Sequence, residues 1–249
     1  MIPRIIHYCW FGGRPVPSEI SDYIKTWRKH LPQFTIKQWD ETNFDIKRNL
    51  YTEQAYFAKK YAFVSDVARL FALVSEGGLY LDTDVLIKKP LPEEWFDRYK
   101  AFFGFEHDTY ITTGVMASEA QHPFLKEFLD LYDNISFFHG LKIDITTNVH
   151  RFTTFMRNKG FALNNTFQQK DGVAIFPQIY LCGKDWKKGR YDNDKTYALH
   201  DFRGEWTRDF LRNALSKHFR MCKIISSWHL SKLSASLLTR HKHYDKENL

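Results

Sequence analysis

The first 45 residues alternate short apolar runs with amphipathic stretches. Residues 4–8 and 34–39 are short and rich in β-branched or aromatic side chains, which predicts two strands. Apolar positions recur at helical spacing over residues 18–31, which predicts a helix between these strands. We expect another helix to open at Asp40 or Thr42. This alternation of strand and helix favours a layered α/β architecture.

A longer amphipathic stretch follows. Apolar positions spaced by three and four predict a helix over residues 56–78, which ends at a pair of glycines. Residues 79–81 then predict a strand, followed directly by Asp82-Thr83-Asp84. In α/β proteins, ligands bind in loops at the ends of strands, so these aspartates lie at an expected ligand position.

The remaining pattern continues the same architecture without a repeat or linker, which indicates one continuous domain. The expected strands are residues 101–105, 110–117 and 173–176, and the expected helices are residues 122–133 and 145–159. Phe102, Phe103 and Phe105 are expected in the core and not as a stacking platform.

Composition narrows the class of protein. The chain has 249 residues, of which 43% are hydrophobic and 17% aromatic, so it has enough material for a packed core. Cys9, Cys182 and Cys222 are odd in number and far apart, which favours reduced thiols in a cytoplasmic protein over a disulfide framework. No apolar run is long enough to cross a bilayer.

The C-terminal part differs in charge from the rest. Residues 206–244 contain eight lysines and arginines against one acid, Asp209, a net charge of +7, whereas the rest is close to neutral. Apolar positions recur between the basic ones, which predicts amphipathic helices. These helices either cap the domain or lie on the anionic inner face of the cell membrane, with Trp228 near the interface. We favour the membrane surface.

The D-x-D sequence carries the clearest chemistry. Residues two apart in a strand point to the same side, so Asp82 and Asp84 can share a divalent ion such as Mn²⁺ or Mg²⁺. Such an ion would neutralise charge on a leaving diphosphate. By itself D-x-D is a weak signal, because a bare instance is more often a solvated turn than a metal site. Asp66 and Arg69, one helical turn apart, form either a surface ion pair or part of the same cleft.

Two segments resemble a known family. SDVARLFALVSEGGLYLDTDV, residues 65–85, resembles the signature of glycosyltransferase family 32, the DxD sugar-transfer enzymes of capsule and exopolysaccharide synthesis. IPRIIHYCWFGG, residues 2–13, resembles that family's first strand and nucleotide loop. The resemblance implies a single-domain α/β fold of the GT-A type over residues 1–205, with residues 206–249 as a helical extension. It also implies a nucleotide-sugar donor, a divalent metal and retention at the anomeric carbon.

The resemblance assigns roles to individual residues near the N-terminal half. Ile6, His7 and Trp10 would form the wall beside the nucleotide base. Asp66 and Arg69 would bind hydroxyl groups of the donor sugar.

The strand and the D-x-D sequence complete that expected site. Tyr80 would approach the donor phosphates or sugar, Asp82 the ribose and sugar, and Asp84 the metal. The catalytic set expected from the resemblance is Asp66, Arg69, Asp82 and Asp84.

Three further segments match the family less closely. His200 to Trp206 resembles a C-terminal motif whose loop closes over the diphosphate, so His200 and Glu205 are candidate metal ligands and Trp206 a donor contact. Glu205 replaces the usual serine, and His200 equally fits a buried strand histidine. Thr113 lies where an asparagine commonly borders the donor sugar. Residues 146–149 depart from the family in the part that meets the acceptor.

The leading hypothesis is a retaining hexosyltransferase that uses a UDP-linked donor and a glycan or lipid-linked oligosaccharide acceptor. A catalytically silent nucleotide-sugar-binding relative fits the departures as well. A basic nucleic-acid or phospholipid-binding module accounts for the pI of about 9.1 but leaves the D-x-D and Asp66/Arg69 set unexplained. We therefore expect no nucleic-acid partner.

Overall fold

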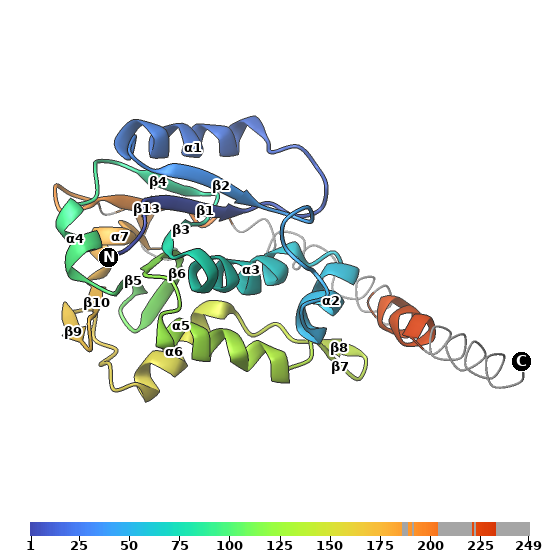
Figure 1. The fold of residues 1–249 in the computed structure, drawn as a ribbon. Coiled ribbons are helices and arrows are strands. Elements are labelled where there is room, and N and C mark those ends of the chain that lie inside the picture. The colour runs from blue at the N-terminus through green and yellow to red at the C-terminus, as the bar shows by residue number, and fades with distance from the viewer. Residues whose placement is uncertain (186–188, 191, 204–220, 222, 233–249) are drawn as a thin grey trace, which may run out of the picture.

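A seven-stranded sheet forms the centre of the computed structural model, which describes residues 1–185, 189–190, 192–203, 221 and 223–232 (Figure 1). Neighbouring strands follow the order β2, β1, β3, β6, β5, β10, β9. Their bounds are β1 Ile5–Cys9, β2 Thr35–Trp39, β3 Gly78–Leu81, β5 Ala101–His107, β6 Tyr110–Ser118, β9 Gln168–Lys170 and β10 Val173–Phe176.

The sheet is mixed: five of its seven strands run in one direction, and β6 and β9 run in the other. β1 pairs in parallel with β2 and β3, and β10 pairs in parallel with β5, whereas β6 runs antiparallel to both β3 and β5. The start of β6 therefore lies beside the carboxyl end of β3. The expected α/β class is confirmed, and the pairing brings the residues after β3 next to the residues that begin β6.

One face of the sheet is covered by an outer layer of short elements. This layer comprises α1 Ser18–His30, β4 Val85–Ile87, α4 Glu93–Arg98, α7 Gln178–Leu181 and β13 Ala198–His200. The Trp27 indole of α1 is fully buried and donates to the Val85 carbonyl at 2.7 Å, which fixes α1 over β4. β4 in turn pairs antiparallel with β13.

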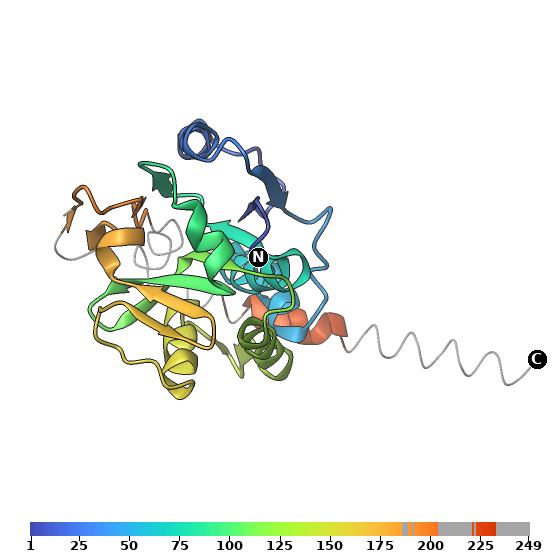
Figure 2. The same ribbon diagram turned by 60° about the vertical axis from the view of Figure 1, so that its left-hand side comes forward.

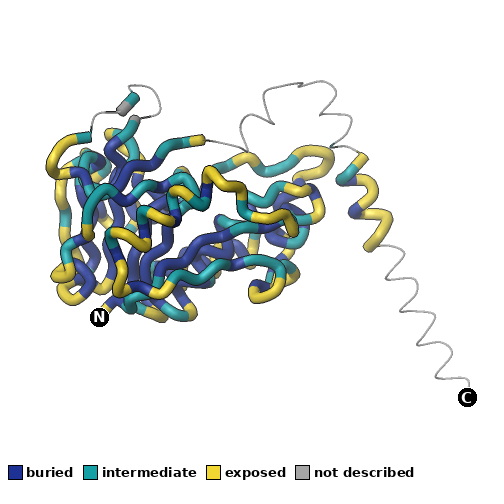
Figure 3. The backbone as a smooth tube through the Cα atoms, turned by 90° about the horizontal axis from the view of Figure 1, so that it is seen from above, coloured by how far each residue is buried: buried dark blue, intermediate teal, exposed yellow. Residues whose placement is uncertain are grey.

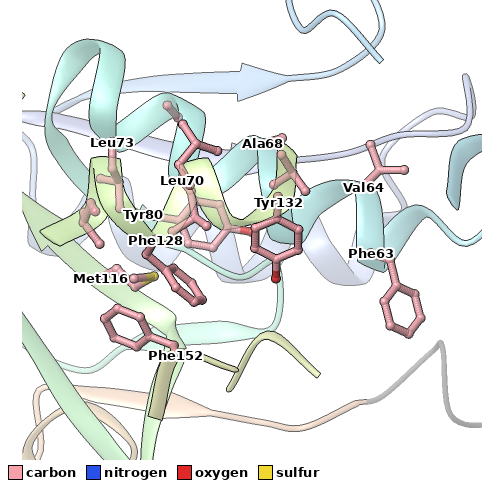
Figure 4. Packing of buried hydrophobic residues seen from close by; sticks show 14 of the residues in the cluster. Phe63, Val64, Ala68, Leu70, Leu73, Tyr80, Met116, Phe128, Tyr132 and Phe152 are labelled. Atoms are coloured by element: carbon pink, nitrogen blue, oxygen red, sulfur yellow. The ribbon is translucent and has the colours of Figure 1, made fainter. Parts of the chain in front are cut away.

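The other face carries most of the described helices. They are α2 Leu50–Phe57, α3 Tyr61–Glu76, α5 Pro123–Asp130, the 3-10 helix η1 Leu131–Asn134 and α6 Asn148–Asn158. Figure 4 shows Leu70 and Leu73 of α3 packed with Met116 of β6, Phe128 of α5 and Phe152 of α6. Tyr80 of β3 belongs to this core, while its neighbours Leu79 and Leu81 face the opposite layer, as the alternation of a strand requires. The expectation that Phe102, Phe103 and Phe105 are core residues is confirmed.

Short hairpins complete the described elements. β7 Phe138–His139 pairs with β8 Lys142–Ile143, and β11 Lys184–Asp185 pairs with β12 Gly189–Arg190. In Figure 3 the buried backbone runs through the middle of the described residues, and exposed segments surround it.

Two helix predictions differ from the structure. No helix starts at Asp40, whose carboxylate accepts from the Thr42 backbone N–H at 2.9 Å and so closes a turn; α2 begins later, after Asn49. The stretch expected as one helix over 56–78 is divided between α2 and α3. Lys59, between them, has a positive φ of 57°, which a continuous helix does not permit.

The C-terminal segment packs on the helical layer where it is described. Residues 223–232 are helical, and Figure 2 shows this segment beside α2. Trp228 is only 5% exposed, and its ring lies 5.2 Å from that of Phe57 and 6.0 Å from that of Phe138. Lys232 donates to Glu53 at 2.7 Å. The expectation that Trp228 faces a membrane is therefore wrong, because the ring is buried against the protein.

The rest of the predicted extension, residues 206–220, 222 and 233–249, lies outside the described residues. Cys222 is among them, whereas Cys9 and Cys182 are buried and are not joined in a disulfide. Within the described part of the chain, no helix has the length and apolar character needed to cross a membrane.

Candidate functional site

The D-x-D aspartates lie at the carboxyl edge of the sheet. The Asp82 backbone N–H donates to the Gly114 carbonyl at 2.8 Å, which extends the pairing of β3 with β6 by one residue. A turn closed by Val85 N–H and the Asp82 carbonyl at 3.0 Å then starts β4. His200 is the residue of β13 that pairs with Val85. The turn and this pairing place His200 beside both aspartates.

Three ligand-type atoms converge at this point. Asp84 Oδ1 lies 3.2 Å from His200 Nε2, and Asp82 Oδ2 lies 3.8 Å from the same nitrogen. The candidate ligand atoms of the three residues all lie within 4.8 Å of one another. The other carboxylate oxygens have protein partners: Tyr80 donates to Asp82 Oδ1 at 2.9 Å, and the Arg203 N–H donates to Asp84 Oδ2 at 2.8 Å. Each aspartate thus directs one oxygen to the cluster, which we call the Asp–Asp–His cluster.

The space within the cluster depends on Gly114. A Cβ atom at this position would lie 2.7 Å from His200 Cε1 and 2.9 Å from Asp82 Oδ2, both closer than such contacts occur. The glycine therefore leaves room for the imidazole and the carboxylate to face each other. Two carboxylate oxygens and one imidazole nitrogen are a suitable partial ligand set for Mn²⁺ or Mg²⁺, so these residues fit a divalent ion.

The charged residues of the cluster shift one another's pKa values. Burial alone would raise the pKa of Asp84, but His200 and the Arg203 N–H outweigh it and lower the pKa to about 2. Burial would lower the pKa of His200, yet Asp84 and Asp82 hold it well above its ordinary value. Without metal, the two aspartates therefore favour the protonated form of His200. Because a ligating imidazole must be neutral, metal binding would release a proton.

Arg69 joins the Asp–Asp–His cluster to the middle of α3. Its guanidinium donates to Asp66 at 2.8 Å and to the Thr113 carbonyl at 2.7 Å, and it lies 3.4 Å from Asp82. The guanidinium also lies over the Tyr80 ring, 4.8 Å from its centroid. Burial raises the pKa of Asp66 to about 6, against the pull of Arg69. The cleft interpretation of Asp66 and Arg69 is thus supported over a surface ion pair, since both are buried.

The three residues expected at the nucleotide base have different positions. Ile6 and His7 lie within the sheet and have no exposed surface. His7 Nε2 donates to the Gly77 carbonyl at 2.7 Å, and His7 Nδ1 accepts from Trp39 at 3.0 Å, so both nitrogens serve the fold. Trp10 follows the carboxyl end of β1, is half-buried, and donates to the Arg14 carbonyl at 2.7 Å. Of the three, Trp10 has the surface that a ligand contact needs.

Some of the other predicted site residues are described by the structure, and some are not. Glu205 and Trp206 lie outside the described residues. Residues 146–149 enter α6, and Thr147 caps this helix by accepting from the His150 N–H at 3.2 Å. Thr113 borders the cluster through its carbonyl, as given above, and its side chain lies 3.2 Å from Arg69.

Glu106 is a site residue that sequence reasoning missed. It lies near the carboxyl end of β5, and burial raises its pKa to about 7, with His200, Thr112, Asp82 and Arg69 as its electrostatic neighbours. Its position at the end of a strand expected in the sheet was the available signal. The sequence does not give the order of the strands in the sheet, so this position could not show that Glu106 lies near His200 and Asp82.

A family model for a glycosyltransferase sugar-binding region containing a DXD motif matches residues 17–102. These residues are therefore similar to a glycosyltransferase sugar-binding region. They include Asp66, Arg69, Asp82 and Asp84, so the glycosyltransferase character expected from the sequence is confirmed for this part of the chain.

Two curated proteins are similar over part of the chain. An uncharacterized glycosyltransferase of Acanthamoeba polyphaga mimivirus is 35% identical over 135 residues, which are 49% of this chain and 52% of that protein. A human alpha-1,4-N-acetylglucosaminyltransferase is 35% identical over 66 residues, 26% of this chain and 18% of that protein. The chain thus spans about half or less of the length of these relatives.

A solved structure is also similar. It is a glycosyltransferase involved in glycosylation of the major capsid of PBCV-1, with 12% identity and a TM-score of 0.48, covering 83% of this chain and 98% of that one.

Proposed function

We propose that this chain is a metal-dependent glycosyltransferase of the GT-A type that moves a hexose from a nucleotide sugar to a glycan acceptor. One observation carries the proposal. The aspartates of a matched DXD region converge with His200 at the carboxyl edge of the sheet, and the buried pair Asp66 and Arg69 lies directly beside them. The donor is proposed to be UDP-linked and the product anomer to be retained, as the family resemblance implies.

Asp82 Oδ2, Asp84 Oδ1 and His200 Nε2 would hold the divalent ion, Mn²⁺ or Mg²⁺. The ion would supply positive charge that stabilises the leaving diphosphate. Tyr80 and Arg69 keep Asp82 oriented through its other oxygen, and the Arg203 N–H does the same for Asp84. These contacts fix the two carboxylates before a ligand arrives, which lowers the reorganisation that binding requires.

Arg69 and Asp66 would bind the transferred sugar. The Ser65 and Thr113 carbonyls and Asp66 hold the guanidinium in one orientation, so the second N–H of Nη2 has a fixed direction. The Asp66 carboxylate can accept from a sugar hydroxyl, and its burial strengthens that hydrogen bond. The acceptor is proposed to be a glycan or lipid-linked oligosaccharide in surface polysaccharide synthesis.

The decisive experiment compares Asp84→Ala with Asp171→Asn, an exposed aspartate in the turn between β9 and β10. UDP-glucose, UDP-galactose, UDP-N-acetylglucosamine and GDP-mannose are offered with Mn²⁺, and release of the nucleoside diphosphate is measured. We expect wild type and Asp171→Asn to hydrolyse at least one donor, and Asp84→Ala to be slower by about 100-fold or more.

Hydrolysis that needs no metal, or that persists in Asp84→Ala, would contradict the proposal. If wild type binds a donor with Mn²⁺ but neither hydrolyses nor transfers it, the chain is a nucleotide-sugar-binding protein and not an enzyme.

A further inference from the structure

A groove opens beside the start of α6, separate from the Asp–Asp–His cluster. It lies between η1, the β7–β8 hairpin and α6, and its volume is about 740 Å³, within the range of about 300–1,000 Å³ typical of small-molecule sites. Residues that line it include Ile135, Ser136, Ile143, Asp144, Ile145 and Arg151. We call it the Arg151 groove. In Figure 1 the β7–β8 hairpin lies toward the side to which the arrowheads of β1 and β2 point.

A charged pair forms the polar part of this groove. Arg151 donates to Asp144 Oδ2, and Asp144 Oδ1 accepts from the Thr146 N–H at 2.8 Å. The Arg151 side chain is 22% exposed, and its buried Nε makes no hydrogen bond within the described part of the chain. Arg151 therefore has a fixed orientation and partial access to the groove.

Helix α6, which carries Arg151 of the groove, packs against β6, the strand that carries Thr113. The Thr153 hydroxyl of α6 accepts from the Ile111 N–H at 3.0 Å, which fastens α6 to the start of β6, two residues before Thr113. Arg151 is close enough to Asp66 to lower its pKa, against the larger effect of burial. The guanidinium also lies 6.0 Å from the centroid of the Tyr132 ring. Arg151 is thus both part of the groove lining and an electrostatic neighbour of Asp66.

We propose that the Arg151 groove binds the acceptor saccharide and that Arg151 contacts its hydroxyl groups next to the transferred hexose. Carboxylate, guanidinium and serine groups suit sugar hydroxyls, and the three isoleucines suit the apolar faces of sugar rings. This inference rests on the proposed function. In the reaction, an acceptor hydroxyl oxygen bonds to the anomeric carbon, the bond from that carbon to the diphosphate oxygen breaks, and the hydroxyl proton leaves with the diphosphate.

The test measures binding of the labelled full chain to a printed glycan array, with UDP and Mn²⁺ present. Arg151→Lys keeps the charge but loses the planar fork. Ile145→Asp places a charge at a rim position that is 54% exposed, so it is expected to fold normally. Lys126→Gln, an exposed change on α5, is the matched control.

We expect wild type and Lys126→Gln to bind the same glycans, and Arg151→Lys and Ile145→Asp to bind them about tenfold more weakly or not at all. Calorimetry of UDP with Mn²⁺ is run on each variant, and all four proteins should bind alike. The inference is overturned if wild type binds no glycan on the array, which would point to a peptide acceptor, or if both groove variants bind as wild type does. Absence of UDP binding in wild type would instead refute the proposed function.

Discussion

The Asp–Asp–His cluster is held together by contacts between charged groups, whereas the helical segment 223–232 is held to the protein by burial of apolar side chains. In the cluster, two partly buried carboxylates lie beside a buried imidazole, and the buried Arg69 guanidinium lies next to Asp82. In the segment, Ile225 and Trp228 are buried, and Lys232 pairs with Glu53 at the rim. Burying charges costs free energy even when they are paired, whereas burying apolar area stabilises. We therefore expect the cluster to serve ligand binding at some cost to stability, and the segment to serve stability.

The same comparison explains why charge in a sequence has two meanings. Residues 206–244 are densely basic, yet Trp228, which lies between lysines in this segment, packs into the core. The acids near β3 are few, but strand pairing gathers them at one edge. The high density of basic residues along the sequence predicted a membrane-binding surface. The candidate site instead arises where a few charged residues come together in space.

The largest expected effect concerns Trp228. Trp228→Ala removes a buried indole packed on Phe57 and Phe138, so the free energy of unfolding should fall by about 3–5 kcal/mol. Leu230→Ala, at a position that is 65% exposed in the same helix, should change it by less than about 0.5 kcal/mol. Urea denaturation measures both. Equal stability of the two variants would show that the segment does not support the fold.

A smaller effect is expected from Gly114→Ala. The added Cβ would crowd His200 and Asp82, so Mn²⁺ affinity measured by calorimetry should fall about 100-fold, or about 2.7 kcal/mol. Gly104→Ala is the matched control, because its Cβ would lie 2.9 Å from Leu181 Cβ and crowd the core instead. That variant should lose stability and keep its Mn²⁺ affinity. If Gly114→Ala binds Mn²⁺ as tightly as wild type, the cluster is not the metal site.

The third effect is a pH dependence of stability that Asp66 causes. Burial raises the pKa of its native carboxyl to about 6 from an ordinary value of 3.8, so the unfolded chain ionises first as pH rises. Wild type should therefore lose stability relative to Asp66→Asn between about pH 4 and pH 6, by on the order of 2 kcal/mol. Denaturation in EDTA at pH 4, 5, 6 and 7 measures the difference. If the difference in free energy of unfolding between wild type and Asp66→Asn did not change with pH, burial would not raise the pKa of Asp66.

Local pattern predicted much of this fold and only part of the site. The long strands and the helix of Asp66 and Arg69 follow from periodicity, which depends on neighbours in sequence. β4 and β13 have three residues each, too few for a pattern, so the pairing that brings His200 to Asp84 was not foreseen from periodicity. His200 was found by family resemblance. Glu106 and Arg151 were missed because their roles depend on contacts across the fold.

The central claim is that Asp82, Asp84 and His200 together hold the divalent ion. Pulsed electron paramagnetic resonance of Mn²⁺ bound in the presence of UDP tests it directly, because a ligating imidazole nitrogen couples to the electron spin. We predict nitrogen coupling in wild type and in His229→Ala, a change at an exposed histidine, and its loss in His200→Ala. Coupling that persists in His200→Ala, or wild-type Mn²⁺ with no nitrogen ligand, would contradict the account.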